Sequence, residues 1–100
     1  MMAQGASGCI SVTANLVPNI KAQIIHLVQQ GKYDDARILN NTLYPLNKAL
    51  FCEANPIPIK AAMYLSGLID TLEYRLPLTP PSAQSLKLLE ETLSNYKIIK

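Results

Sequence analysis

One short segment of this chain has the residue pattern of a β-strand, and it is the only good strand candidate in the sequence. Residues 9–14, Cys-Ile-Ser-Val-Thr-Ala, are partly β-branched and alternate weakly between apolar and polar. A lone strand cannot satisfy its own N–H and C=O groups, and even a two-stranded hairpin is marginal in water. This segment therefore predicts a sheet whose other strands these residues do not supply.

The rest of the chain has the periodicity of helices. Apolar side chains of residues 18–30 recur at i, i+4, i+7 and i+8, and Gly31 follows where a helix C-terminus favours glycine. A leucine stripe between residues 36 and 50 contains Pro45. We expect this proline to kink one helix near residues 41–45 rather than to separate two helices.

Prolines divide the second half of the chain. Residues 55–58, Asn-Pro-Ile-Pro, end one segment and start a helix that carries an apolar stripe up to Leu68. Residues 70–81 hold three prolines and are predicted to be a loop. Ser82 is a candidate N-cap for a last helix reaching Tyr96. The predicted fold is mainly α, with one barrel-type strand and four helices, and its first strand–helix pair resembles the last β/α unit of a larger α/β protein.

The composition indicates a chain whose apolar surface is covered in part by another protein surface. It has 100 residues, of which 49% are hydrophobic and only 16% charged, which excludes intrinsic disorder. A chain this short has surplus apolar residues that need a partner surface. The net charge of +2 argues against nucleic acid or an anionic membrane as a partner. Without a signal-peptide pattern or an apolar run of about 20 residues, the expected location is cytoplasmic.

The reactive residue types form no complete catalytic or metal-binding constellation. Cys9, Cys52 and His26 share no metal-ligand spacing, so no metal or other cofactor is expected, and the two cysteines are interpreted as buried reduced thiols. Lys60 follows a proline-rich turn early in a helix, where a surface or structural role is favoured over Schiff-base chemistry. Arg75 lies between apolar residues and is interpreted as one half of a buried ion pair. No residue is assigned a catalytic role.

Three segments together resemble the dihydrodipicolinate synthase family. Residues 8–15 read G-C-I-S-V-T-A-N, residues 50–60 read L-F-C-E-A-N-P-I-P-I-K, and residues 75–80 read R-L-P-L-T-P. Each resembles a segment of that family, in the family's order and at about its spacing. The departures are small, with Cys9 and Ile59 standing where valine is usual.

The resemblance implies a lyase that condenses pyruvate with aspartate semialdehyde in lysine and diaminopimelate biosynthesis, through a Schiff base on a lysine of a (β/α)₈ barrel. Residues 1–31 would be the last β/α unit of that barrel, and residues 32–100 its C-terminal helical domain. The Schiff-base lysine and the proton-relay residues belong to an earlier region of the family and match nothing here. The one position that carries over is Ile10, whose backbone would line the pyruvate site.

The leading interpretation is therefore a C-terminal fragment of this family that is inactive by itself and binds pyruvate only within a complete barrel. A barrel of this type needs roughly 250 residues. Two alternatives stay open. One is a stand-alone, non-catalytic helical module for interaction or homo-oligomerisation. The other is a subunit that associates with a separate chain supplying the missing barrel.

Overall fold

The computed structural model describes residues 1–97 and contains five α-helices in that range, preceded by two short 3₁₀ turns. The helices are α1 (Pro18–Gln29), α2 (Tyr33–Thr42), α3 (Tyr44–Ala49), α4 (Ile57–Leu65) and α5 (Ala83–Asn95), and the 3₁₀ turns are Met2–Gln4 and Thr13–Asn15. The chain divides into two compact units, Met1–Tyr44 (unit 1) and Pro45–Lys100 (unit 2). No helix in residues 1–97 has the length and apolar character needed to cross a membrane.

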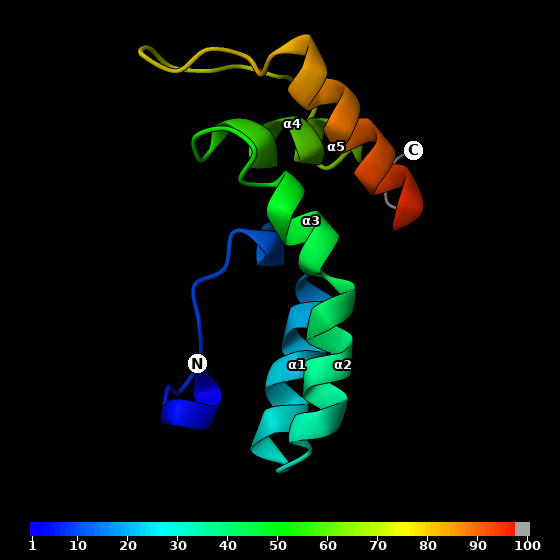
Figure 1. The fold of residues 1–100 in the computed structure, drawn as a ribbon. Coiled ribbons are helices and arrows are strands. Elements are labelled where there is room, and N and C mark those ends of the chain that lie inside the picture. Colours follow the sequence, from blue (N-terminus) through cyan, green and yellow to red (C-terminus); the bar gives the residue numbers. More distant parts are fainter. Residues whose placement is uncertain (98–100) are drawn as a thin grey trace. The chain divides into compact units, whose positions relative to one another are not determined.

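Unit 1 is built around a pair of packed helices. Helices α1 and α2 lie side by side and are joined by the turn at Gly31 (Figure 1). Gly31 has φ +76°, and the following N–H of Lys32 bonds the Leu27 carbonyl at 2.8 Å, which is the glycine-dependent helix ending that the sequence predicts. The apolar stripe of α1 is only half-buried, and no residue of α1 is fully buried.

The strand predicted over residues 9–14 is wrong: residues 1–97 contain no strand. Residues 6–11 have no regular structure, and Val12 already has helical backbone angles before the 3₁₀ turn Thr13–Asn15. The Ser11 hydroxyl accepts a hydrogen bond from the Ala14 N–H at 3.3 Å, and such local side-chain bonds compete with strand pairing. A β-prone segment forms a ladder only when a second strand accepts its backbone bonds, and none lies in the described part of this chain.

The leucine stripe around Pro45 forms two helices rather than the single kinked helix that was expected. Helix α2 ends at Thr42, Leu43 lies between, and α3 begins at Tyr44. The Leu43 N–H bonds the carbonyl of Asn40, an i−3 contact that tightens the last turn. Proline at position 45 has no N–H to donate to the carbonyl of Asn41, so the helical ladder is interrupted there.

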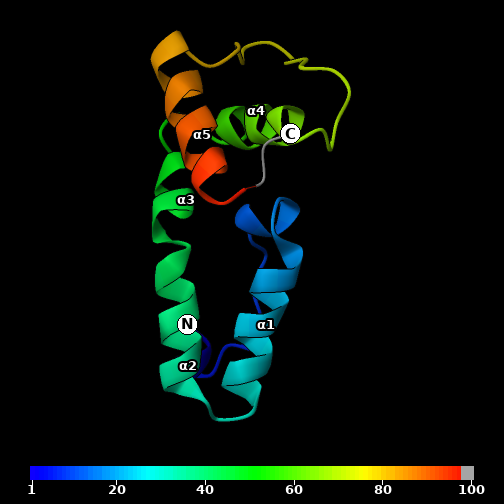
Figure 2. The same cartoon turned by 90° about the vertical axis from the view of Figure 1, so that its right-hand side faces the viewer.

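Unit 2 holds the well-buried core of this chain. Helix α5 packs against α4, with the long loop between them leading into α5 (Figure 2). The core consists of apolar side chains from α3, the turn after it, α4 and α5: Leu46, Ala49, Leu50, Ile57, Pro58, Ile59, Ala61, Ala62, Leu89 and Leu93. The predicted loop over residues 70–81 is confirmed, as is the Ser82 N-cap, whose hydroxyl accepts the Ser85 N–H at 3.2 Å.

The expected boundary between residues 31 and 32 refers to a complete barrel and stays a prediction. The two compact units of this chain divide later, between Tyr44 and Pro45. The reason is local: α2 packs on α1 directly after the Gly31 turn, so both helices belong to unit 1.

Candidate functional site

Ile10, the one residue expected to contact substrate, lies in the irregular segment before the Thr13–Asn15 turn. Its side chain is fully exposed, at 107% of the reference area. Its backbone N–H and C=O make no hydrogen bond to any other residue of the described range 1–97. Main-chain groups in this state are open to a ligand or to a neighbouring strand, so the predicted backbone role of Ile10 stays a prediction.

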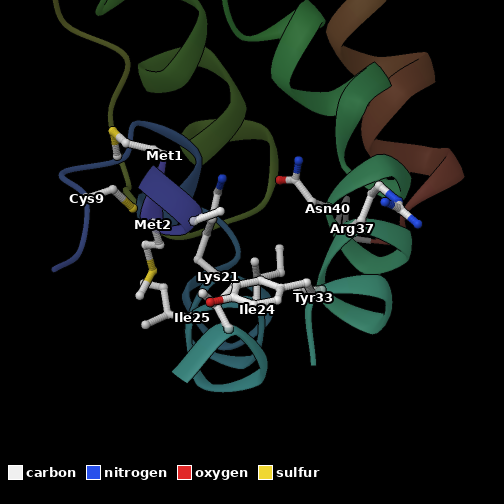
Figure 3. Close-up of a pocket in the computed structure, with 12 residues that line it drawn as sticks. Met1, Met2, Cys9, Lys21, Ile24, Ile25, Tyr33, Arg37 and Asn40 are labelled. Carbon is white, nitrogen blue, oxygen red and sulfur yellow. The ribbon is translucent and has the colours of Figure 1, made fainter. Parts of the chain in front are cut away.

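A pocket of about 380 Å³ opens within unit 1, between the N-terminal segment and one face of the α1–α2 pair (Figure 3). Its lining is largely apolar, with polar groups from both helices: Met1, Met2, Ala3, Cys9, Lys21, Ile24, Ile25, Val28, Tyr33, Ala36, Arg37 and Asn40. Ile10 is not among these residues, so the pocket does not contain the predicted pyruvate contact.

The polar groups of this pocket are basic or neutral. In Figure 3 the Lys21 side chain extends upward and the Asn40 amide points toward the Lys21 side of the pocket, while the Arg37 guanidinium points away from it. The Arg37 guanidinium donates to the Asp34 carboxylate at 2.8 Å, an exposed pair within α2. No carboxylate lines the pocket, whose ionisable side chains are those of Cys9, Lys21, Tyr33 and Arg37.

A second polar cluster lies in unit 2, where the turn after α3 meets the first turn of α5. The Glu53 carboxylate accepts the Ser82 N–H at 3.0 Å, and the Ser82 hydroxyl lies 3.5 Å from the same oxygen. Hydrogen bonds from the side chain of Ser85 and from the backbone of Ser82 hold the pKa of Glu53 below its usual value. A carboxylate at a helix N-terminus also interacts favourably with the helix dipole, so this cluster fixes the start of α5.

The loop before α5 is tied to α4 by two side chains. The Tyr74 hydroxyl donates to the Ile57 carbonyl at 2.9 Å, and the Lys60 ammonium donates to the Glu73 carbonyl. Lys60 Nζ also lies 5.1 Å from the centre of the Tyr74 ring, within the range of a cation–π interaction. Burial, with a smaller contribution from the charge of Glu53, raises the pKa of Tyr74. Lys60 therefore has the structural role that the sequence favours.

The structure also shows the environment of the two cysteines, His26 and Arg75. Cys9 and Cys52 are both free and both exposed, so the prediction of buried thiols is wrong. His26 is exposed and its ring bonds the Gln30 amide at 3.0 Å. Arg75 is exposed and forms no ion pair within residues 1–97, so the expected buried pair is also wrong. No group of three or more His, Cys, Asp or Glu side chains that could hold a metal ion occurs in the described residues.

Sequence reasoning missed the roles of Glu53 and Tyr74. Glu53 lies inside the segment of residues 50–60 that carries the family resemblance, and that position was the available signal. Its partners Ser82 and Ser85 lie about thirty residues further on, and no local pattern predicts such a pairing. No sequence pattern indicates the role of Tyr74, because the acceptor of its hydroxyl is a main-chain carbonyl 17 residues earlier in the chain.

Comparison with known proteins identifies what the chain is similar to. Residues 1–96 match the model of the dihydrodipicolinate synthetase family. The curated 4-hydroxy-tetrahydrodipicolinate synthase of Aliarcobacter butzleri is 58% identical over 100 residues, which is all of this chain and 34% of that protein. The chain therefore spans about a third of the length of the curated relatives that it matches.

Solved structures agree with the sequence match. The crystal structure of dihydrodipicolinate synthase from Aquifex aeolicus is 39% identical with a TM-score of 0.94, over 98% of this chain and 33% of that one. The chloride-inhibited dihydrodipicolinate synthase from Acinetobacter baumannii, in complex with pyruvate, is 43% identical with a TM-score of 0.90. That match covers 98% of this chain and 33% of the Acinetobacter chain.

Proposed function

This chain belongs to the dihydrodipicolinate synthetase family, and from that premise we propose that it is the C-terminal part of a 4-hydroxy-tetrahydrodipicolinate synthase. The observation that carries the proposal is a match spanning the whole chain at 58% identity, over only about a third of the relative. In the complete protein, residues 1–31 would form the last β/α unit of the barrel and residues 32–100 the helical domain that follows it.

The reaction proposed for the complete enzyme is the condensation of pyruvate with aspartate semialdehyde. A lysine amine attacks the pyruvate carbonyl, water leaves, and the resulting imine makes the pyruvate methyl group acidic enough to react. No lysine of this chain matches the Schiff-base lysine of the family, and Lys60 is engaged with the Glu73 carbonyl. The chain's own contribution would be the backbone of Ile10 at the pyruvate site and the packing of its helices on the barrel.

The 100-residue chain is expected to be inactive alone. Incubation with pyruvate followed by borohydride reduction, which traps an imine as a stable amine, is the test. Intact-mass measurement should show no pyruvyl adduct on this chain. The Aliarcobacter butzleri relative treated in parallel should be labelled. A pyruvyl adduct on the 100-residue chain would contradict the proposal.

The role of Ile10 is tested in a longer protein, in which this chain replaces the matching third of the Aliarcobacter butzleri relative. Ile10→Val keeps the main chain and should leave pyruvate affinity nearly unchanged. Ile10→Pro removes the N–H and should weaken both strand pairing and pyruvate binding. A large loss of pyruvate affinity in Ile10→Val would show that the side chain, not the backbone, makes the contact.

The second candidate is a stand-alone helical module that associates with copies of itself. The observation in its favour is internal packing: α4 packs on α5 in unit 2, and α1 packs on α2 in unit 1. Sedimentation equilibrium combined with thermal unfolding distinguishes the two functions. A monodisperse oligomer with one cooperative transition favours the module, whereas a molten or aggregating chain favours the enzyme fragment.

A further inference from the structure

The two cysteines of this chain are both free and exposed, but only one of them shares a pocket with other sulfur atoms. Cys9 lines the unit 1 pocket together with Met1 and Met2. Cys52 lines a second pocket, in unit 2, to which no methionine contributes. The two thiols therefore differ in the donor groups around them, and Cys52 is a natural control for Cys9.

A tight turn and a glycine bring the three sulfur-bearing residues to one pocket. Met2 begins a 3₁₀ turn that lies against α1 and ends at Gly5, whose N–H bonds the Met2 carbonyl at 3.0 Å. Gly5 has φ +104°, a backbone angle that residues with a Cβ rarely adopt, so glycine allows the chain to change direction there. The irregular segment that follows places Cys9 at the same side of the pocket as Met1 and Met2 (Figure 3).

The three side chains are accessible and can adapt to a ligand. Met1 is 74% exposed, Cys9 is exposed and Met2 is half-buried. A methionine side chain is unbranched and has three rotatable bonds, so its thioether can turn toward a common point at little cost. All three residues precede α1, so their sulfur atoms can converge without any rearrangement of a helix.

The sulfur atoms of this pocket are soft metal ligands. The described residues hold no cluster of three His, Cys, Asp or Glu side chains, which are the groups that bind Zn²⁺ and Ca²⁺. One thiolate with two thioethers is a different donor set, and it favours Cu(I). The expectation that no metal is bound was based on the cysteines and His26, so it did not cover this donor set.

The charges around the pocket favour a monovalent ion. Its charged side chains are the cations Lys21 and Arg37, and no carboxylate lines it. A divalent ion on a single thiolate would leave a net positive charge near Lys21, whereas Cu(I) on that thiolate forms a neutral pair. Arg37 points away from the pocket and is paired with Asp34 at 2.8 Å.

We infer that Met1, Met2 and Cys9 form a binding site for a soft monovalent metal ion, Cu(I), with one thiolate and two thioether ligands. Binding replaces the proton of the Cys9 thiol, which is released to water, and transfers no electrons. The site uses residues of unit 1 only and goes beyond the proposed function. Its failure is distinguishable, because Cu(I) affinity tests the site whereas the pyruvyl adduct tests the enzyme.

The test is an anaerobic titration of the 100-residue chain with Cu(I) in the presence of bicinchoninate, a coloured Cu(I) chelator that competes with the protein. The native chain should take up one Cu(I). Cys9→Ser should weaken binding by more than about a hundredfold, because even the loss of a hydrogen-bond partner around a metal ligand costs about 10–100-fold. Cys52→Ser is the matched control and should leave the Cu(I) affinity unchanged.

The methionines are tested with the double variant Met1→Leu/Met2→Leu, released from a cleavable fusion so that residue 1 can be changed. Leucine keeps the apolar volume but removes the sulfur, so the helical circular dichroism should stay the same. The Cu(I) affinity should fall at least about tenfold. Met63→Leu, at a half-buried methionine of α4, is the control and should leave the Cu(I) affinity unchanged.

Three results would overturn the site. The first is a native chain that takes no Cu(I) from bicinchoninate. The second is an equal loss of affinity in Cys52→Ser and Cys9→Ser, which would mean that either thiol binds Cu(I) without methionine. The third is a double methionine variant that keeps the native affinity, since Cys9 would then bind Cu(I) alone.

Discussion

Helix α1 in unit 1 and helix α5 in unit 2 both have an apolar stripe at helical spacing, but only α5 buries its stripe. Leu89 and Leu93 of α5 are completely buried, whereas every residue of α1 is at least partly exposed. The difference lies in the partners. Helix α5 packs on α4 and shares a core with α3, while α1 has α2 and short 3₁₀ turns beside it. An apolar stripe at helical spacing therefore forms part of a buried core in unit 2 but stays partly exposed in unit 1.

The largest expected effect comes from removing a core side chain in each unit. Leu89→Ala should destabilise the protein by about 2–5 kcal/mol, because it leaves a cavity among fully buried neighbours. Ile24→Ala, on the half-buried face of α1, should cost clearly less. Urea unfolding monitored by circular dichroism measures both. Equal losses would mean that unit 1 is as well packed as unit 2.

A smaller effect is expected at the helix N-termini. Ser82→Ala removes the hydroxyl that accepts the Ser85 N–H and should cost about 1 kcal/mol. Helix α2 begins after Lys32, whose side chain makes no capping bond, so Lys32→Ala should change stability by less than about 0.5 kcal/mol. A loss at Lys32 as large as that at Ser82 would contradict the difference between the two units.

The loss of folding stability at acid pH should depend on Glu53. Its pKa is lowered in the folded protein, so its contribution to stability is present above the usual glutamate pKa and is lost as pH falls through the folded value. The thermal midpoint of the native chain should therefore decline more steeply on acidification than that of Glu53→Gln. Asp34→Asn, at the exposed ion pair of unit 1, is the control and should follow the native curve. If the thermal midpoints of the native chain and of Glu53→Gln decline in parallel on acidification, the Glu53 carboxylate does not stabilise the start of α5.

A further effect is expected at alkaline pH, through Tyr74. Its pKa is raised in the folded protein, so its stabilising contribution is present below the usual tyrosine pKa and is lost as pH rises through the folded value. Tyr74→Phe should cost about 1 kcal/mol at neutral pH by removing the bond to Ile57, and should flatten the alkaline decline. Tyr33→Phe, an exposed tyrosine of unit 1, is the matched control. If Tyr33→Phe flattens the alkaline decline in stability as much as Tyr74→Phe does, the decline does not arise from the Tyr74 hydroxyl bonded to Ile57.

Local signals determined where α1 ends, where α5 begins and where the loop between α4 and α5 lies. Gly31 ends α1 because only glycine accepts a positive φ without strain, Ser82 starts α5 because its hydroxyl reaches the Ser85 N–H, and three prolines exclude a helix from residues 70–81. The segments at residues 8–15, 50–60 and 75–80 indicate the family by residue identity, and the family match over residues 1–96 confirms it. Each of these conclusions depends on neighbours within a few residues, or on residue identity alone.

Only the tertiary structure decided the state of residues 9–14, the exposure of both cysteines, and the contacts of Glu53 and Tyr74. A strand needs a second strand, burial needs a neighbouring surface, and the partners of Glu53 and Tyr74 lie 17 or more residues away. Sequence periodicity reports which face of an element is apolar, but it does not report what covers that face. In this chain α5 and α1 differ for that reason.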